Sequence, residues 1–171
     1  ITAAIFARQD DATGQPLVEL MLDEAQQKGT GKWTSQNALD LGVPTHTINA
    51  AVEARIISAH RAERQQAAQV FPPGAPSFTG DRVALFEDVR AALYAAVLCA
   101  YAQGFDLMQA ASAEYSYDLN LAEIATIWRG GCIIRAGLLE DIRAVFGAQP
   151  DLPNLLLAEP FRSAIAERQD A

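Results

Sequence analysis

Residues 81–113, DRVALFEDVRAALYAAVLCAYAQGFDLMQAASA, decide the fold class of this chain. Asp81 is a typical helix N-cap, and apolar side chains follow it at every third or fourth position. The main apolar stripe consists of Phe86, Val89, Leu93, Val97 and Ala100. Alanine and leucine, both strong helix formers, fill much of the remainder. The pattern predicts a long helix that continues past Gly104 to about Ala113 and packs this stripe closely in the middle of the structure.

Helical patterns also precede this segment. Thr34 or Ser35 is expected to cap a helix of about two turns that stops at Gly42. The other expected elements are a helix end over residues 1–8, a loop over 9–16, a short amphipathic helix over 17–27 and a long helical stretch over 45–70.

Further helices are predicted after the central one. Asn120 and Glu123 have the spacing of a capping box, which predicts a helix ending at Trp128 or Arg129, before Gly130-Gly131. The remaining helical pieces are expected over 132–146, 154–158 and 160–169. Alternating apolar and polar runs are scarce, and no Asn-Gly or Asp-Gly turn separates two of them. The sequence therefore predicts an all-α, multi-helix domain with long central helices, spanning residues 1–171 as one domain.

Charge and hydropathy exclude several classes of partner. The chain has 13 basic and 21 acidic residues, a formal net charge of −8, and Lys28 and Lys32 are its only lysines. Nucleic-acid-binding domains normally carry a basic face, so binding to nucleic acid or to an anionic membrane surface is not expected. No stretch reaches the roughly 20 apolar residues that a membrane helix requires. A small anionic ligand, which needs only two or three local cations, remains compatible with this charge.

Cysteine and histidine spacing indicates neither a metal site nor a catalytic centre. Cys99 and Cys132 are far apart and have no second cysteine or histidine at ligand spacing. His46 and His60 have no obvious carboxylate or thiol partner. There is also no dinucleotide-binding glycine motif and no phosphate-binding Walker loop. We therefore expect buried, reduced thiols in a cytoplasmic protein and no metal.

The segment Lys28-Gly29-Thr30-Gly31-Lys32-Trp33-Thr34-Ser35 is the best candidate for a ligand site. Two glycines allow a tight turn and close approach of a ligand, and a lysine and hydroxyl groups follow at once. If the helix begins at Thr34 or Ser35, open N–H groups and the positive end of the helix dipole would attract an anion there. Trp33 would wall such a site. The alternative is an ordinary helix-to-helix turn with a capping residue.

Arg55 is the second candidate. It follows Ala50-Ala51-Val52-Glu53-Ala54, and an arginine on a mostly apolar stripe needs a partner. Glu53 is two residues away and lies on a different face of a helix. A phosphate held by Arg55 and Lys32 together would satisfy the guanidinium. A salt bridge to a distant carboxylate would satisfy it equally well.

These residues resemble the helical domain of 6-phosphogluconate dehydrogenase, the decarboxylating enzyme of the oxidative pentose phosphate pathway. The resemblance begins with Lys28–Thr34 and covers nearly the whole chain. The other matching segments are Ala38–Pro44, Glu53-Ala54-Arg55, Ala92-Leu93-Tyr94, Tyr101–Phe105, Asp118-Leu119-Asn120 and Ile124–Arg135.

The resemblance implies a function for this chain. Family members oxidise 6-phosphogluconate at C3 with NADP, or in some members NAD, and the 3-keto acid then loses CO₂ to yield ribulose 5-phosphate. Residues matching Lys32, Thr34 and Arg55 help to hold the substrate phosphate. The helical domain also forms much of a homodimer interface. The expected partners are therefore 6-phosphogluconate and a second subunit.

The resemblance also implies what this chain lacks. The family's Rossmann domain, which binds the cofactor, its catalytic lysine and glutamate, and its C-terminal tail are expected to lie outside residues 1–171. The chain is then a helical fragment that does not turn over substrate alone. Two alternatives remain: the helical domain of a related β-hydroxyacid dehydrogenase, whose substrates generally lack a phosphate, and a helical interaction module without a ligand.

Overall fold

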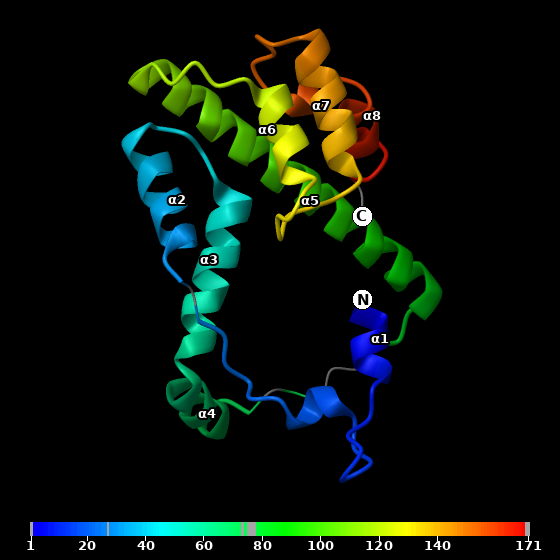
Figure 1. Ribbon diagram of the computed structural model, residues 1–171. Helices are drawn as coiled ribbons and strands as arrows, with labels where there is room; N and C mark the ends of the chain where they lie inside the picture. The colour runs from blue at the N-terminus through cyan, green and yellow to red at the C-terminus, as the bar shows by residue number, and fades with distance from the viewer. Residues whose placement is uncertain (1, 27, 73, 75–77, 170–171) are drawn as a thin grey trace. The chain divides into compact units, whose positions relative to one another are not determined.

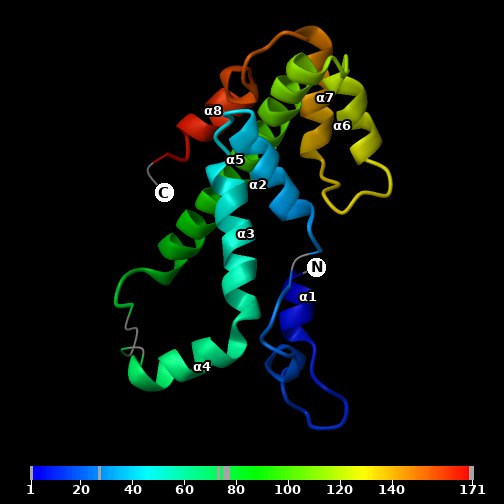
Figure 2. The same cartoon turned by 90° about the vertical axis from the view of Figure 1, so that its left-hand side faces the viewer.

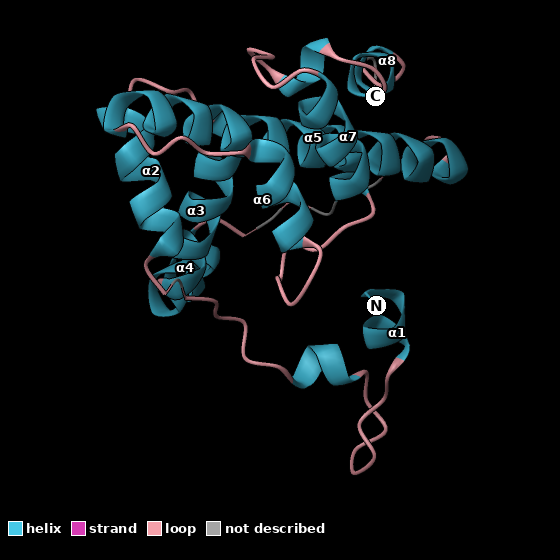
Figure 3. Ribbon diagram, turned by 45° about the horizontal axis from the view of Figure 1, so that its top comes forward, coloured by secondary structure: helices cyan, strands magenta, loops and turns pink. Residues whose placement is uncertain are grey.

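The computed structural model describes residues 2–26, 28–72, 74 and 78–169. The regular secondary structure of these residues is helical, apart from an isolated β-bridge between Gln9 and Pro16, as Figure 3 shows. The all-α prediction is confirmed. By their contacts, the residues fall into two compact units, one of residues 1–27 and 53–75 and one of residues 28–52 and 76–171.

The helices are given in chain order, and the α-helices carry the labels used in Figure 1. They are α1 (Thr2–Ala7), the 3₁₀ turn η1 (Leu17–Leu20), α2 (Thr30–Asp40), α3 (His46–Ala59), α4 (Arg61–Val70), α5 (Arg82–Tyr115), α6 (Leu121–Trp128), α7 (Leu138–Ala148), the 3₁₀ turn η2 (Leu155–Leu157) and α8 (Phe161–Ala166).

The central helix forms as predicted. Asp81 caps α5 through Oδ1, which accepts hydrogen bonds from the N–H groups of Val83 (2.8 Å) and Ala84 (3.4 Å). The helix passes Gly104 and ends at Tyr115, followed by Ser116 in a left-handed conformation with φ 57°. Local signals specify this element, because it has a strong cap and no interior proline, and the one interior glycine, Gly104, does not interrupt it.

The hydrophobic core lies at the carboxyl-terminal half of α5. Phe105 is 1% exposed, and its ring centroid lies 5.2 Å from that of Phe146 and 5.3 Å from that of Trp128. Elements α6, α7, η2 and α8 gather around this half of α5 (Figure 2). The buried core residues are Leu98, Ala102, Phe105, Leu121, Ala125, Leu139, Ile142, Val145, Phe146, Leu152, Leu155, Ala158 and Phe161.

The predicted apolar stripe of α5 is not the packed one. Phe86, Val89 and Leu93 are 61%, 55% and 65% exposed, whereas Leu98 and Ala102 are buried. The periodicity correctly predicted a helix, but it could not show which part of the helix would meet partners. Among the described residues, the buried side chains of α5 are those of Leu98, Ala102 and Phe105.

The unit of residues 1–27 and 53–75 is held mainly by polar contacts. Arg64 donates to the Asp23 carboxylate (2.9 Å), to the Asp23 carbonyl (2.7 Å) and to the Ser58 carbonyl (3.1 Å). The Ser58 hydroxyl accepts a hydrogen bond from the Ala25 N–H at 2.9 Å. The ion pair with Arg64 lowers the pKa of the Asp23 carboxyl below its usual range. The described residues of α1, α3 and α4 include no buried side chain.

Three predicted helices have different bounds in the structure. The helix expected over 17–27 is reduced to η1 within the described residues 17–26, where Met21 and Leu22 stay 58% and 67% exposed; Gln27 lies outside the described residues. The stretch expected over 45–70 is divided into α3 and α4 at His60, whose ψ of 49° is not helical. The helix expected from Cys132 begins only at Leu138, and residues 132–137 are turns and irregular chain after Gly130-Gly131.

Candidate functional site

Helix α2 begins five or six residues earlier than the sequence predicted, because its N-cap is Gly29 and not Thr34 or Ser35. Gly29 is its N-cap, with φ 108°, a left-handed conformation that favours glycine. The Trp33 N–H donates to the Gly29 carbonyl at 2.9 Å, and a Cβ on Gly29 would lie 3.7 Å from the Trp33 ring. The expectation that Thr34 or Ser35 begins this helix is therefore wrong. Glycine serves as the cap without a side-chain hydrogen bond. The general preference for serine and threonine caps therefore placed the predicted start of the helix too late in the sequence.

The earlier start moves the open N–H groups of the candidate anion site. The hydroxyl of Thr34 donates to the Thr30 carbonyl at 2.9 Å, and that of Ser35 donates to the Gly31 carbonyl at 3.2 Å, as is usual inside a helix. The N–H groups without a partner inside the helix are those of its first turn, from Thr30 to Lys32. An anion at this end would thus meet backbone donors from residues 30–32, not from residues 34 and 35.

Lys32 and Thr34 both belong to the beginning of α2. Lys32 is the third residue of the helix and is exposed, whereas Thr34 is partly buried. Residues two apart on a helix do not face each other, but helical side chains lean toward the amino terminus. A phosphate that met both side chains would therefore lie toward the amino-terminal end of α2.

Arg55 lies on α3, and its side chain is exposed. Its Nε donates to the carbonyl oxygen of Gln26 at 3.1 Å, and its Nη2 donates to the same oxygen. The partner that the sequence required is therefore a backbone carbonyl. A guanidinium has five N–H groups, and two of them are used at Gln26, so the group retains donors for an oxyanion.

A cavity of about 620 Å³ brings Thr34 together with residues that the sequence did not single out as a site. Its lining is mostly apolar, with the hydroxyl-bearing side chains of Thr34 and Tyr101 and the cation of Arg135 among it. Tyr101 donates its hydroxyl hydrogen to the Ile134 carbonyl, and burial raises the pKa of this phenol. Tyr101 and Arg135 stand in segments that carry the family resemblance, but no motif spacing marks them as neighbours of Thr34.

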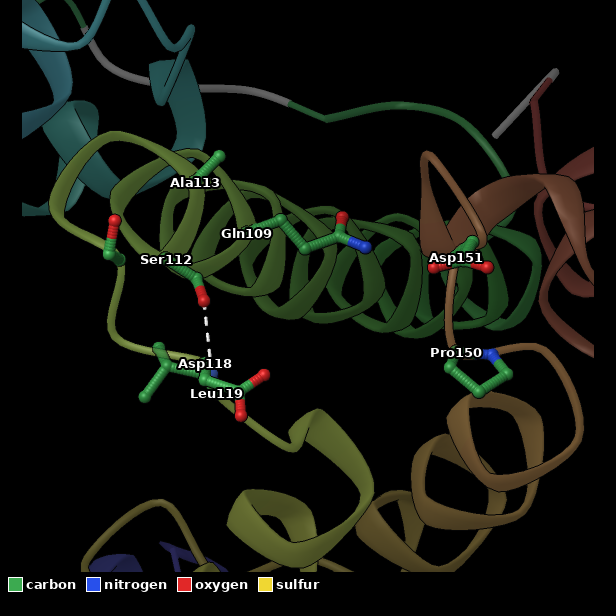
Figure 4. A pocket seen from close by; sticks show the side chains of 8 residues that line it. Gln109, Ser112, Ala113, Asp118, Leu119, Pro150 and Asp151 are labelled. Carbon is green, nitrogen blue, oxygen red and sulfur yellow. Dashed lines mark hydrogen bonds between the residues drawn. The ribbon is translucent and has the colours of Figure 1, made fainter.

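A second hollow, of about 580 Å³, is polar and acidic (Figure 4). Gln109, Ser112, Asp118 and Asp151 are among its lining residues. The Ser112 hydroxyl oxygen accepts a hydrogen bond from the Leu119 N–H at 3.0 Å, which holds the start of the segment leading to α6. Two carboxylates repel a phosphate, so this hollow does not compete with α2 as an anion site.

The remaining sequence expectations concern thiols, metals and membranes. Cys99 and Cys132 are free but only partly buried, so the expectation that both thiols are buried is wrong. Among the described residues, no group of three or more His, Cys, Asp or Glu side chains could hold a metal ion. None of the described helices combines the length and the apolar character needed to cross a membrane.

Comparisons with known proteins identify curated relatives. The chain is 55% identical over 171 residues to the decarboxylating 6-phosphogluconate dehydrogenase of Synechococcus elongatus, covering 99% of this chain and 36% of that protein. It is 50% identical over 172 residues to the NADP(+)-dependent decarboxylating enzyme of Bacillus subtilis, covering all of this chain and 37% of that protein. The chain thus spans little more than a third of the length of these relatives.

A solved structure and a family model agree with these relatives. Plasmodium falciparum 6-phosphogluconate dehydrogenase, solved in its apo form, with its cofactor NADP+ and with its substrate 6-phosphogluconate, matches with a TM-score of 0.90 and 38% identity. The match covers 99% of this chain and 37% of that one. All residues, 1–171, match the family model described as "6-phosphogluconate dehydrogenase, C-terminal domain". The resemblance seen in the sequence is confirmed, and the chain belongs to the family of 6-phosphogluconate dehydrogenase C-terminal domains.

Proposed function

We propose that this chain is the substrate-binding and dimerisation domain of a 6-phosphogluconate dehydrogenase. The observation that carries the proposal is the amino-terminal turn of α2, where Lys32 and unpaired backbone N–H groups offer an anion site in a chain that matches this family throughout. The names of the relatives supply the reaction: the decarboxylating dehydrogenation of 6-phosphogluconate.

The whole enzyme oxidises the C3 hydroxyl of 6-phosphogluconate with NADP, or with NAD in some family members. The 3-keto acid then loses CO₂, and the enediol becomes ribulose 5-phosphate, a step of the pentose phosphate pathway. This chemistry needs a general base at the C3 hydroxyl and a general acid at the enediol. We assign neither role, and no cofactor contact, to a residue of this chain. The chain alone is therefore expected not to turn over substrate.

The proposed contribution of this chain is to position the substrate. Lys32, Thr34 and Arg55 hold the phosphate, an ammonium and a guanidinium supplying charge and a hydroxyl supplying a further hydrogen bond. A phosphate anchored far from the reacting carbon orients that carbon, so binding energy is used for alignment. Each charged contact is expected to contribute about 2–3 kcal/mol to binding.

Calorimetric titration of the chain with 6-phosphogluconate tests this proposal. Lys32→Ala and Arg55→Ala are each expected to weaken saturable binding by about 30-fold or more, the equivalent of about 2 kcal/mol. Arg82→Ala is the control, because it removes an exposed cation outside the candidate segment 28–35. An equal loss of affinity in the control would show that the effect comes from the change in net charge, and it would contradict the assigned site.

Absence of binding by the unaltered chain would count against a phosphate site in this domain alone and would favour an interaction module. Gluconate, which lacks the phosphate, is the ligand control. If gluconate bound as tightly as 6-phosphogluconate, a related dehydrogenase acting on a substrate without phosphate would become the better assignment.

The proposal extends to assembly and location. The enzyme is expected to be a homodimer, since α5 exposes large apolar side chains that a second subunit could cover. We place it in the cytoplasm, where its free cysteines would stay reduced.

A further inference from the structure

Helices α2 and α3 bury very little apolar surface. Among the described residues, Ala38 is the only buried member of α2, and α3 has no buried member. Apolar packing has no preferred direction. The little that α2 buries is also too small to define its orientation against neighbouring helices. Its placement must therefore depend on directional contacts.

Hydrogen bonds link α2 to the start of α3. The single hydrogen of the Ser35 hydroxyl is shared between Asn49 Oδ1 at 2.7 Å and the Gly31 carbonyl at 3.2 Å, with Asn49 the shorter contact. Thr45, which is 2% exposed, donates its hydroxyl hydrogen to the same Asn49 oxygen at 3.2 Å. One amide oxygen thus joins two helices and the turn between them.

Gln103 links the start of α3 to α5. Its Oε1 accepts hydrogen bonds from the N–H groups of Thr47 (3.0 Å) and Ile48 (3.3 Å), and its Nε2 donates to the Thr47 hydroxyl at 3.1 Å. These N–H groups belong to the first turn of α3, which has no partner for them within the helix. A side chain from another helix, in the carboxyl-terminal half of α5, therefore caps α3.

We propose that Ser35, Asn49 and Gln103 are positioning residues that fix α2, and with it Lys32 and Thr34, against α3 and α5. The inference rests on the proposed phosphate role of Lys32 and Thr34. Ser35 directly follows Thr34, so a shift of α2 at Ser35 moves the phosphate contacts as well. The three side chains do not touch the substrate; they set the geometry of the residues that do.

The first test separates affinity from stability by calorimetry with 6-phosphogluconate and by urea unfolding. Gln103→Met is expected to weaken binding about tenfold, the loss that one misplaced hydrogen-bonding group produces. Gln109→Met is the matched control, because Gln109 is on the same helix and donates to the Leu152 carbonyl at 2.9 Å. Gln103→Met loses three hydrogen bonds and Gln109→Met loses one, so both variants should lose stability and the Gln103 variant more, but only Gln103→Met should lose affinity. Equal losses of affinity would overturn the positioning role.

A second pair of variants tests the link through α2. Ser35→Ala removes the hydroxyl while favouring the helix, and it is expected to weaken binding about tenfold. Ser35→Thr keeps the hydroxyl and is expected to retain the affinity of the unaltered chain. If Ser35→Ala bound as well as Ser35→Thr, the link would have no positioning role.

A measurement without ligand distinguishes failure of this inference from failure of the proposed function. Amide hydrogen exchange in α2 should be about tenfold faster in Ser35→Ala than in Ser35→Thr, because the helix opens more often when its tie to Asn49 is lost. If the unaltered chain bound no 6-phosphogluconate, the proposed function would fail, and this exchange difference would still support the network. Equal exchange in the two variants would overturn the network whatever the binding result.

Discussion

Asp106 is a half-buried carboxyl on α5, and burial raises its pKa above the usual value for aspartate. A raised folded-state pKa means that the folded chain disfavours the ionised form. The stability associated with the neutral carboxyl is fully present below the unfolded-state pKa. It is lost as the pH rises through the folded-state pKa.

Asp106→Asn removes this charge with little change in shape. At pH 7 the variant is expected to unfold at higher urea concentration than the unaltered chain, with a gain of about 0.5 kcal/mol after allowance for solvent screening. At pH 3 the two proteins should be equally stable. Asp88→Asn, an exposed position on the same helix, is the control and should change little at either pH. A variant less stable than the parent at pH 7 would contradict this account.

Single residues show what the sequence can indicate about the site and where it stops. Lys32 and Arg55 stay predicted site residues, chosen because one cation follows two glycines and the other lies on a mostly apolar stripe. Gly29 was not recognised as the helix cap, since the preference for serine and threonine caps is only statistical. Gln103 was missed altogether, because a polar residue in a long helix carries no signal that a distant helix terminus uses it.

The helices differ in how far residues within the segment itself, such as caps, determine where the helix forms. The start of α5 at Asp81 and that of α6 at Asn120, which accepts a hydrogen bond from the Glu123 N–H at 3.1 Å, follow from capping residues and were predicted. The segment 17–27 and the stretch from Cys132 to Leu138 have helical patterns but no such local specification. Their apolar faces form helices only if something packs against them, and that depends on tertiary structure.

The Asp81 cap of α5 leads to a prediction about the stability of that helix. Asp81→Ala removes the acceptor for the Val83 and Ala84 N–H groups and is expected to destabilise the chain by about 1 kcal/mol. Asp81→Ser keeps a capping oxygen and should restore most of that stability. Thermal unfolding followed by circular dichroism measures both. No difference between the alanine and serine variants would mean that the amino-terminal half of α5 contributes nothing to the cooperative fold.

At the scale of the molecule, α5 contains two different surfaces. Its carboxyl-terminal half carries Leu98, Ala102 and Phe105 into the core, whereas the earlier stripe of Phe86, Val89 and Leu93 lies open. The sequence specified both halves with the same periodicity, so periodicity could not distinguish a core face from an interface face. Contiguous apolar patches on a folded protein commonly mark contacts with another chain.

The open stripe predicts self-association of the chain. Sedimentation velocity over a range of micromolar concentrations should show a concentration-dependent dimer, because burying these side chains against a second copy removes apolar surface from water. The double variant Phe86→Glu with Leu93→Glu should sediment as a monomer with its helical content retained. Ile127→Glu is the matched control, since Ile127 is 69% exposed on α6 and lies outside the stripe. A parent chain that stays monomeric throughout, or a control that dissociates as fully as the double variant, would exclude this stripe as the dimer contact.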